Sequence, residues 1–328
     1  MHILVTGGAG FIGSHFVKMI LRDIPDAFVV TLDALTYAGR RVNLAEMPAE
    51  HRKRHVFKQG NVCDCDQVNA LLQEHQIDTI VHLAAESHVD LSLTNRVFNF
   101  ITTNVTGTHV LLEAALTYSV RQFVYVSTDE VYGSIPGGTL VDETHPLQPR
   151  NPYAASKAAA DLLCLSYVAT HQLPVCITRG SNTYGSHQHP EKFLAKCMCA
   201  ALTGQPMPIY GTGENRRQWL HVQDHCRGIM RALQQGKPGD IFNLGGADIR
   251  SNMEMAKQIF AMRGVDSGLL QLVDDRKGHD WRYAMNCEKA GAEIGWKPEI
   301  TLESGMRETL DWYDCHRAWI DDATVTQQ

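Results

Sequence analysis

The sequence predicts an α/β protein in which helices cover both faces of a doubly wound parallel sheet, with a smaller, irregular C-terminal domain. Three observations predict this fold. Short β-branched runs alternate with helical patterns through the first half of the chain. The expected strands are almost entirely apolar, as strands are when both of their faces are covered. After about residue 180, clusters of Pro and Gly interrupt the alternation.

Each expected element has its own residue pattern. The strands are short apolar runs, expected at residues 3–5, 28–32, 55–58, 79–83, 122–127 and 175–178. The helices separate these strands and are expected at residues 11–21, 66–75, 97–116 and 151–170. The first helix follows a Gly-rich turn, and the last is rich in Ala at its start. The polar tail from residue 321 onward is expected to fray.

The composition limits the class of protein. The 328 residues allow about two domains, and 44% hydrophobic with 20% charged residues excludes intrinsic disorder. A net charge of −6 without a long basic run argues against nucleic-acid and anionic-membrane partners. No apolar run reaches the roughly 18–20 residues that span a bilayer.

Nine cysteines, odd in number and irregularly spaced, indicate reduced thiols. Together with an amino terminus that shows no leader peptide, they predict a cytoplasmic location. The pairs Cys63/Cys65 and Cys197/Cys199 lack the spacing of a zinc knuckle, so we expect no metal site.

A Gly-rich turn separates the first expected strand from the first helix. Its glycines are spaced Gly7-x-x-Gly10-x-x-Gly13. Glycines let the backbone approach a pyrophosphate, and the amino end of a helix supplies N–H donors and a positive dipole. This strand–turn–helix context predicts a dinucleotide site of Rossmann type. The residues expected to contact the cofactor here are Gly7, Gly10, Phe11, Ile12 and Gly13.

An acidic residue ends the second expected strand. Asp33 lies 33 − 13 = 20 residues after Gly13, where a carboxylate is expected to bind the adenosine ribose hydroxyls. Because it would repel a 2′-phosphate, NAD is favoured over NADP. Asn61, after the third strand, could face the adenine edge, since its amide both donates and accepts.

Two groups of residues suggest catalysis. Tyr153 and Lys157 are spaced i and i+4, so they share a helix face, and a nearby ammonium would lower the Tyr pKa and make it a base. Thr128, Asp129 and Glu130 follow the fifth strand, where ligands sit in open parallel sheets. Hydride transfer does not need two adjacent acids, so this pair predicts a second reaction with an acid and a base.

From residue 1 to about residue 313, the chain resembles the dTDP-glucose 4,6-dehydratases, which are extended short-chain dehydrogenases/reductases. The stretches that carry the resemblance are 83–90, 127–133, 151–153 with Lys157, 189–192, 275–280 and 294–296. The Thr-Asp-Glu triplet is the most diagnostic, because nucleotide-sugar 4-epimerases of the same fold lack that acid–base pair.

The resemblance implies NAD-dependent dehydration of a nucleotide-linked hexose, with dTDP-glucose as the expected substrate. Tyr153, Lys157 and Thr128 would serve oxidation at C4, Glu130 would remove the C5 proton, and Asp129 would protonate the leaving 6-hydroxyl. The resemblance also implies a homodimer built on the helices at 97–116 and 151–170. The substrate-binding residues that it implies are Ser87, His88, Asn182, Glu191, Lys192, Arg217, Asn243, Arg276 and His279.

We expect residues 1–180 to form the NAD-binding domain, with a further strand and helix of its sheet possible from 210–245, and 181–328 to form mainly the nucleotide-sugar domain. Several positions depart from the family pattern: Asn61, Leu91, Thr183, Ser186 and Gln218. These departures do not affect the expected reaction type, but they allow a substrate other than dTDP-glucose. The alternatives are a UDP-sugar 4,6-dehydratase, a 4-epimerase and, in a different class, a non-catalytic NAD-binding protein.

Overall fold

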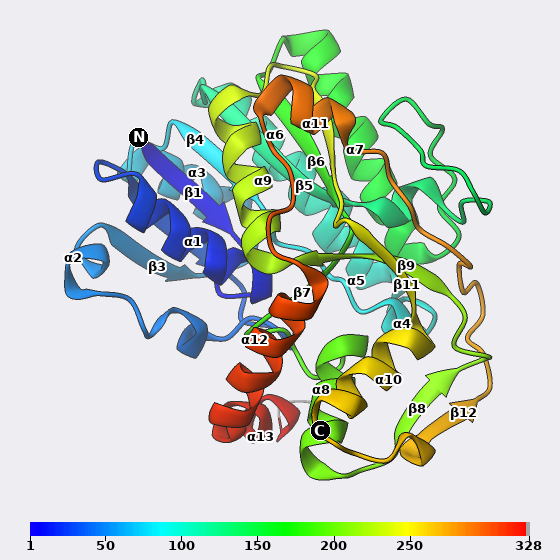
Figure 1. Cartoon of the computed structure of the whole chain (residues 1–328). Coiled ribbons are helices and arrows are strands. Elements are labelled where there is room, and N and C mark those ends of the chain that lie inside the picture. Colours follow the sequence, from blue (N-terminus) through cyan, green and yellow to red (C-terminus); the bar gives the residue numbers. More distant parts are fainter. Residues whose placement is uncertain (326–328) are drawn as a thin grey trace.

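The computed structural model describes residues 1–325, and its centre is a seven-stranded parallel sheet (Figure 1). The strand order is β10-β6-β5-β4-β1-β2-β3. The strands are β1 (His2–Thr6), β2 (Phe28–Asp33), β3 (His55–Gln59), β4 (Thr79–His82), β5 (Gln122–Thr128), β6 (Val175–Gly180) and β10 (Ile241–Leu244). The predicted doubly wound parallel sheet is confirmed, because the chain runs outward from β1 in both directions.

Helices cover both faces of this sheet. On one face lie α1 (Phe11–Asp23), α9 (Val222–Gln235) and α11 (Glu288–Ile294). On the other face lie α3 (Cys65–Glu74), α6 (Gly107–Thr117) and α7 (Pro152–His171). Three short helices lie in the connections: α2 (Ala49–Arg52) between β2 and β3, and α4 (Val89–Ser92) and α5 (Val97–Phe100) between β4 and α6.

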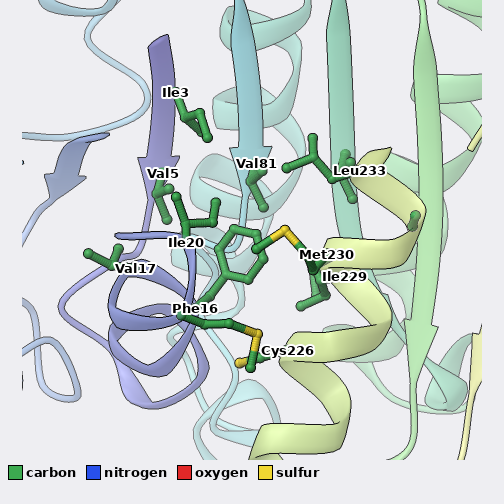
Figure 2. Close-up of a cluster of buried hydrophobic side chains, with 14 of the residues drawn as sticks. Ile3, Val5, Phe16, Val17, Ile20, Val81, Cys226, Ile229, Met230 and Leu233 are labelled. Atoms are coloured by element: carbon green, nitrogen blue, oxygen red, sulfur yellow. The ribbon is translucent and has the colours of Figure 1, made fainter. Parts of the chain in front are cut away.

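Alternate residues of each strand serve the two faces, as the period of two in a β-strand requires. In β1, Ile3 and Val5 pack with α1 and α9, while Leu4 packs with the helices of the opposite face. Figure 2 shows Ile3, Val5 and Val81 facing Phe16 of α1 and Met230 of α9. This double coverage explains why the strands read as continuous apolar runs.

The C-terminal part has a core of its own beyond the carboxyl ends of the strands. It contains a three-stranded sheet of β11 (Asp248–Ser251), β9 (Arg216–His221) and β7 (Asn182–Tyr184), and a two-stranded sheet of β12 (Leu270–Val273) and β8 (Met207–Tyr210). Its helices are α8 (Phe193–Thr203), α10 (Asn252–Met262), α12 (Leu302–Cys315) and α13 (Arg317–Val325). Figure 1 shows these elements below the central sheet.

Two features differ from the expected pattern. The helical stretch expected at 97–116 consists of α5, a π-helical turn at Ile101–Thr106 and α6. The tail expected to fray from residue 321 is helical as far as Val325, because α13 packs its apolar side against α12. Residues 326–328 of that tail lie outside the described part of the chain.

Candidate active site

A cavity of about 460 Å³ lies at the carboxyl ends of the parallel strands. It extends from the loop between β1 and α1 to the C-terminal core. Twenty of the residues singled out in the sequence line it: Gly7, Gly10, Phe11, Ile12, Gly13, Asp33, Asn61, Ser87, His88, Thr128, Asp129, Glu130, Tyr153, Lys157, Asn182, Glu191, Lys192, Arg217, Arg276 and His279.

Asn243, which the sequence places at the substrate, is not among the residues that line this cavity. It lies on β10 and is fully buried. Its side-chain oxygen accepts a hydrogen bond from the Tyr132 hydroxyl at 2.8 Å, and its amide donates to the carbonyls of Val141 and Asn286 at 3.3 and 3.2 Å. These hydrogen bonds engage both the oxygen and the nitrogen of the Asn243 amide, and they join β10 to the segments that cover the sheet.

The Gly-rich turn brings backbone to the cavity wall. Helix α1 begins after Gly10, without a side-chain cap and without an acidic residue in its first turn, so its first N–H groups remain available to an anion. Gly13 is required by packing: a Cβ there would lie 2.1 Å from the Gly7 carbonyl oxygen. The turn can therefore hold this shape only with glycine at residue 13.

Asp33 is fixed at the end of β2 by the backbone. Its two carboxylate oxygens accept hydrogen bonds from the N–H groups of Ala9 at 2.9 Å and Leu35 at 2.8 Å. Burial raises its pKa, while these backbone donors oppose the rise. The carboxylate thus has a set orientation at the cavity edge, and lone pairs remain for further donors.

The acidic pair sits in a short helical turn, Asp129–Tyr132, directly after β5. Thr128 caps this turn by accepting from the N–H of Glu130 at 3.3 Å. Gly133 ends the turn at φ 72°, where a Cβ would lie 2.2 Å from the Gln148 carbonyl oxygen. The loop therefore folds back and leaves both carboxyl groups beside the cavity.

The two acids have different surroundings. Asp129 is 3% exposed, and burial, followed by the charge of Glu130, raises its pKa well above the usual range. Its Oδ2 has no hydrogen-bond partner among the described residues. Glu130 instead accepts from the Asn151 amide at 3.1 Å and from the Tyr283 hydroxyl at 3.4 Å. The pair thus combines a buried acid whose raised pKa favours its protonated form with a neighbour that accepts two hydrogen bonds.

Tyr153 and Lys157 lie on α7 and line the same cavity, but their coupling differs from the expectation. Burial, followed by the charge of Glu130, raises the pKa of Tyr153, and a bond from Thr128 opposes the rise. Lys157 donates to the Val126 carbonyl at 2.8 Å and lies 4.2 Å from the centre of the Tyr125 ring. Burial lowers the pKa of Lys157 to about 8. The expected lowering of the Tyr pKa is therefore outweighed by burial.

A second polar cluster lines the cavity at the C-terminal core. The Glu191 side chain is 5% exposed. Its Oε2 lies 3.2 Å from His88 Nε2, and its Oε1 lies 3.5 Å from Lys192 Nζ. Lys192 also donates to the Ser87 carbonyl at 2.6 Å. Both Glu191 oxygens lack a hydrogen bond among the described residues, as does Asn182 Oδ1. Buried acceptors of this kind suit a ligand with hydroxyl groups.

The three side chains expected at the diphosphate are held in different ways. Arg217 is 3% exposed, donates to the Asp280 carbonyl at 2.8 Å and lies 4.3 Å from the centre of the Tyr283 ring. Arg276 pairs with Asp90 at 3.5 Å. His279 Nδ1 lies 2.6 Å from Asp275, and burial lowers the pKa of His279 to about 4. The charge of Arg217 also opposes the rise in the Asp129 pKa, so Arg217 acts on the acidic pair.

Three contributors to the site were not foreseen. Asn151 caps α7 by accepting from the Ala154 N–H at 2.8 Å and turns its amide to Glu130. The Asn-Pro pair that opens α7 is a visible signal for this cap. Tyr37 lines the cavity, with its hydroxyl 3.3 Å from Ser87 Oγ, and Tyr283 bridges Glu130 and Asp280. No local pattern marks these two tyrosines.

Three of the departures from the family pattern form hydrogen bonds within the protein. Gln218 bonds to the backbone of Met285 and Gly246, and Thr183 bonds to His225 at 2.8 Å. Ser186 accepts from His15 at 2.9 Å through its carbonyl. Leu91, on α4, is not among the cavity-lining residues. Of these positions and Asn61, only Asn61 and Thr183 line the cavity.

Within residues 1–325, no group of His, Cys, Asp and Glu is arranged to hold a metal ion. Among the helices of that part of the chain, none is both long enough and apolar enough to cross a bilayer.

Comparison with known proteins relates this geometry to enzymes. The family model described as GDP-mannose 4,6 dehydratase matches residues 4–309. The dTDP-glucose 4,6-dehydratase of Streptomyces niveus is 46% identical over 323 residues, which cover 97% of this chain and 94% of that protein. Among solved structures, DesIV, a dTDP-glucose 4,6-dehydratase of Streptomyces venezuelae with NAD bound, has a TM-score of 0.94 and 44% identity, covering 98% of this chain and all of that one.

An epimerase is also similar in structure. The UDP-glucose 4-epimerase of Thermotoga maritima, solved with UDP-glucose, has a TM-score of 0.88 and 28% identity, with coverage of 95% of this chain and 98% of that one. Its sequence identity is lower than that of the two dehydratases above. The shared fold thus extends to two reaction types, and the residues in the cavity must distinguish them.

Proposed function

The chain belongs to the GDP-mannose 4,6 dehydratase family. From this membership and from its dTDP-glucose 4,6-dehydratase relatives, we propose that it is an NAD-dependent lyase that converts dTDP-glucose to the 4-keto-6-deoxy nucleotide sugar. The observation that carries the proposal is the acidic pair Asp129 and Glu130 beside Tyr153 in the cavity that also contains the Gly-rich turn. Oxidation at C4 needs one base. Loss of water from C5 and C6 needs a second base and an acid.

The residues of the cavity fit NAD. The uncapped amino end of α1 suits the pyrophosphate, and Gly7, Gly10, Phe11, Ile12 and Gly13 would surround it. Asp33 would accept from the adenosine ribose, and Asn61 would lie beside the adenine. When bound, NAD would accept the hydride from C4 and return it to C6.

The first protein-mediated step would be proton removal from the 4-hydroxyl by Tyr153. Thr128 would stabilise the phenolate by hydrogen bonding, and this bond already opposes the rise in the Tyr153 pKa. Lys157, on the same face of α7, would place its positive charge near the site. The positive charge of the nicotinamide ring of bound NAD would likewise oppose the rise in the Tyr153 pKa.

The second step would be elimination of water. A ketone at C4 acidifies the C5 proton, which Glu130 would remove while Asp129 protonates the departing 6-hydroxyl. Burial and the nearby Glu130 charge, which raise the Asp129 pKa, keep that acid protonated for donation. Glu130 would exchange this proton with solvent before it returns a proton to C5. Tyr153 would release the 4-hydroxyl proton to solvent, and Asp129 would regain a proton from solvent. The residues end in their starting protonation states.

The nucleotide sugar would lie between the acidic pair and the C-terminal core. Arg217 and Arg276 would meet the diphosphate, with His279 beside them, and Ser87, His88, Asn182, Glu191 and Lys192 would meet the sugar and the nucleotide. We take the dTDP-glucose preference from the relatives, since the dTDP-glucose 4,6-dehydratase of Streptomyces niveus is 46% identical to this chain.

The test is incubation of the purified protein with dTDP-glucose in D₂O, without added NAD, followed by mass spectrometry. Loss of water with one deuterium gained is the expected result. Epimerisation would leave the mass and C5 unchanged, and a substrate other than dTDP-glucose would appear as turnover of a UDP-hexose under the same conditions. If every nucleotide hexose stayed unchanged with NAD supplied, the dehydratase proposal would be wrong and the protein would only bind NAD.

We also propose a homodimer built on α5, α6 and α7. These helices and the π-helical turn between α5 and α6 expose large apolar side chains to water: Phe98 is 76%, Leu162 59% and Ile101 43% exposed. Leu112 of α6, in contrast, is fully buried and packs in the core. A second copy covering α5 and α7 would remove this surface from water.

The assignment of residues 1–180 to NAD and of 181–328 mainly to the nucleotide sugar is likewise proposed. It is supported by the Gly-rich turn in the first part and by the separate core around α8, α10 and α12 in the second. A cytoplasmic location is proposed because all nine cysteines are free thiols.

A further inference from the structure

Helix α13 contacts the loop after β2, although 279 residues separate Arg40 from Trp319. The Trp319 indole N–H donates to Asn43 Oδ1 at 2.9 Å. The Arg40 guanidinium lies 4.6 Å from the centre of the Trp319 ring, donates to the Trp319 carbonyl at 2.9 Å and pairs with Asp322. The carboxyl end of the chain is thus attached to residues 40–43.

Asn43 connects this attachment to the Gly-rich turn. Its side chain is buried, and its Nδ2 donates to the Ala9 carbonyl at 2.9 Å. The Arg40 N–H donates to the same carbonyl at 3.0 Å. The Ala9 N–H in turn donates to Asp33 Oδ2 at 2.9 Å. A chain of hydrogen bonds therefore runs from Trp319 through Asn43 and Ala9 to Asp33.

This chain reaches the cavity from outside. Asp33 lines the cavity, whereas Ala9, Asn43 and Trp319 are not among its lining residues. Ala9 is fully buried, so a lost partner for its carbonyl would not be replaced freely by water. A change at Trp319 would then alter the orientation of the Ala9 peptide and, through it, the carboxylate of Asp33.

We infer that α13 positions the adenosine half of the dinucleotide site, with Trp319 and Asn43 holding the Ala9 peptide so that Asp33 meets the ribose. This rests on the proposed function, because it takes NAD to be the ligand at Asp33. Trp319 is a positioning residue, and its effect falls on how long NAD stays bound. Asp129 and Glu130 instead follow β5, which β1 and β4 separate from β2 and Asp33 in the sheet.

The experiment compares Trp319→Phe with Trp312→Phe in the full-length protein. Trp319→Phe keeps an aromatic ring under Arg40 but removes the N–H donor to Asn43. Trp312 stacks on His316 and packs 5.2 Å from Trp319, so its change perturbs the same cluster without touching that bond. Protein loaded with NAD is passed over a desalting column at intervals, and the NAD still bound is quantified chromatographically.

We expect NAD to dissociate about 3- to 10-fold faster from Trp319→Phe, as for one lost buried hydrogen bond, and at the wild-type rate from Trp312→Phe. Asn43→Asp, which cannot donate to Ala9, should show at least this effect, and the double variant should be no faster than Asn43→Asp alone. Excess NAD should restore turnover of Trp319→Phe.

Equal release by Trp319→Phe and wild type would overturn the inference. So would equally fast release by both tryptophan variants, since packing would then explain it, and so would low turnover of Trp319→Phe at saturating NAD. Wild-type protein that binds no NAD would overturn the proposed function as well. That outcome is distinguishable, because it appears before any variant is compared.

Discussion

At the scale of single residues, the most informative group is Asp129. It is nearly fully buried, has one carboxyl oxygen without a partner among residues 1–325, and faces the charge of Glu130. Burial raises its pKa, so the folded protein binds the proton of Asp129 more tightly than the unfolded chain does. A functional acid of this kind reduces the free energy of unfolding at neutral pH.

The sign of this effect can be tested with Asp129→Asn. Between the unfolded pKa of Asp129, about 3.9, and its raised folded pKa, the native state holds one proton more than the unfolded state. The free energy of unfolding of the wild type therefore decreases, by up to about 1.4 kcal/mol for each pH unit, as the pH rises through this range. The amide cannot lose a proton. We expect the Asp129→Asn variant to gain stability relative to wild type as the pH rises above about 4, the unfolded pKa, measured by urea unfolding at equal NAD. A difference that does not change with pH would contradict a raised Asp129 pKa.

Glu130→Gln separates oxidation from elimination. Without a base for the C5 proton, we expect product formation to fall about 10²- to 10⁴-fold. Oxidation at C4 should continue, so the absorbance of NADH should accumulate after addition of dTDP-glucose. Glu303→Gln, exposed on α12, is the matched control and should behave as wild type. Wild-type product formation by Glu130→Gln would assign the C5 proton to another group.

At the scale of elements, the sequence predicted the strands and helices that are marked by a pattern in their own residues. The strands at β1, β2 and β5 begin within one residue of their predicted starts, because buried parallel strands are short, bounded apolar runs. Helix α13 was missed because its stability comes from Trp319 and Arg40, a contact between opposite ends of the chain. Nearly all predicted site residues line the cavity, since they follow strands or open helices. Asn243 and Tyr283 depend on long-range packing that spacing does not encode.

The Gly-rich turn provides a test at this scale. Alanine usually stabilises a helix relative to glycine, but a Cβ at Gly13 would lie 2.1 Å from the Gly7 carbonyl oxygen. We expect Gly13→Ala to displace the turn and weaken NAD binding by at least about tenfold. Gly137→Ala is the control, because a Cβ there meets no atom within 4 Å. Calorimetric titration with NAD measures both, and equal affinities would show that the turn adapts.

At the scale of the whole molecule, the question is how the exposed apolar side chains of α5 and α7 are covered. Helix α5 packs against α7, and Phe98 and Leu162 remain exposed on them. A second copy is the occupant that we propose. A charge in such an interface would lack a partner and water, which disfavours association.

Leu162→Arg should therefore shift the protein from dimer to monomer in sedimentation equilibrium. Leu140→Arg is the control, since Leu140 is 52% exposed on a loop that belongs to none of these helices. Circular dichroism of both variants checks that the fold is retained. A wild-type monomer, or a Leu162→Arg dimer of unchanged affinity, would contradict the proposed interface.

The position of β10 has a consequence for biosynthesis. β10 covers the edge of β6, yet it follows β6 only after α8, α9 and several strands of the C-terminal part have been made. During synthesis, the N–H and C=O groups on this edge of β6 (Val175–Gly180) therefore remain unpaired for several seconds, until residues 241–244 have been made. Translation pauses between these strands would lengthen this exposure. Nascent chains that stall before residue 241 should be the species that chaperones capture and that aggregate.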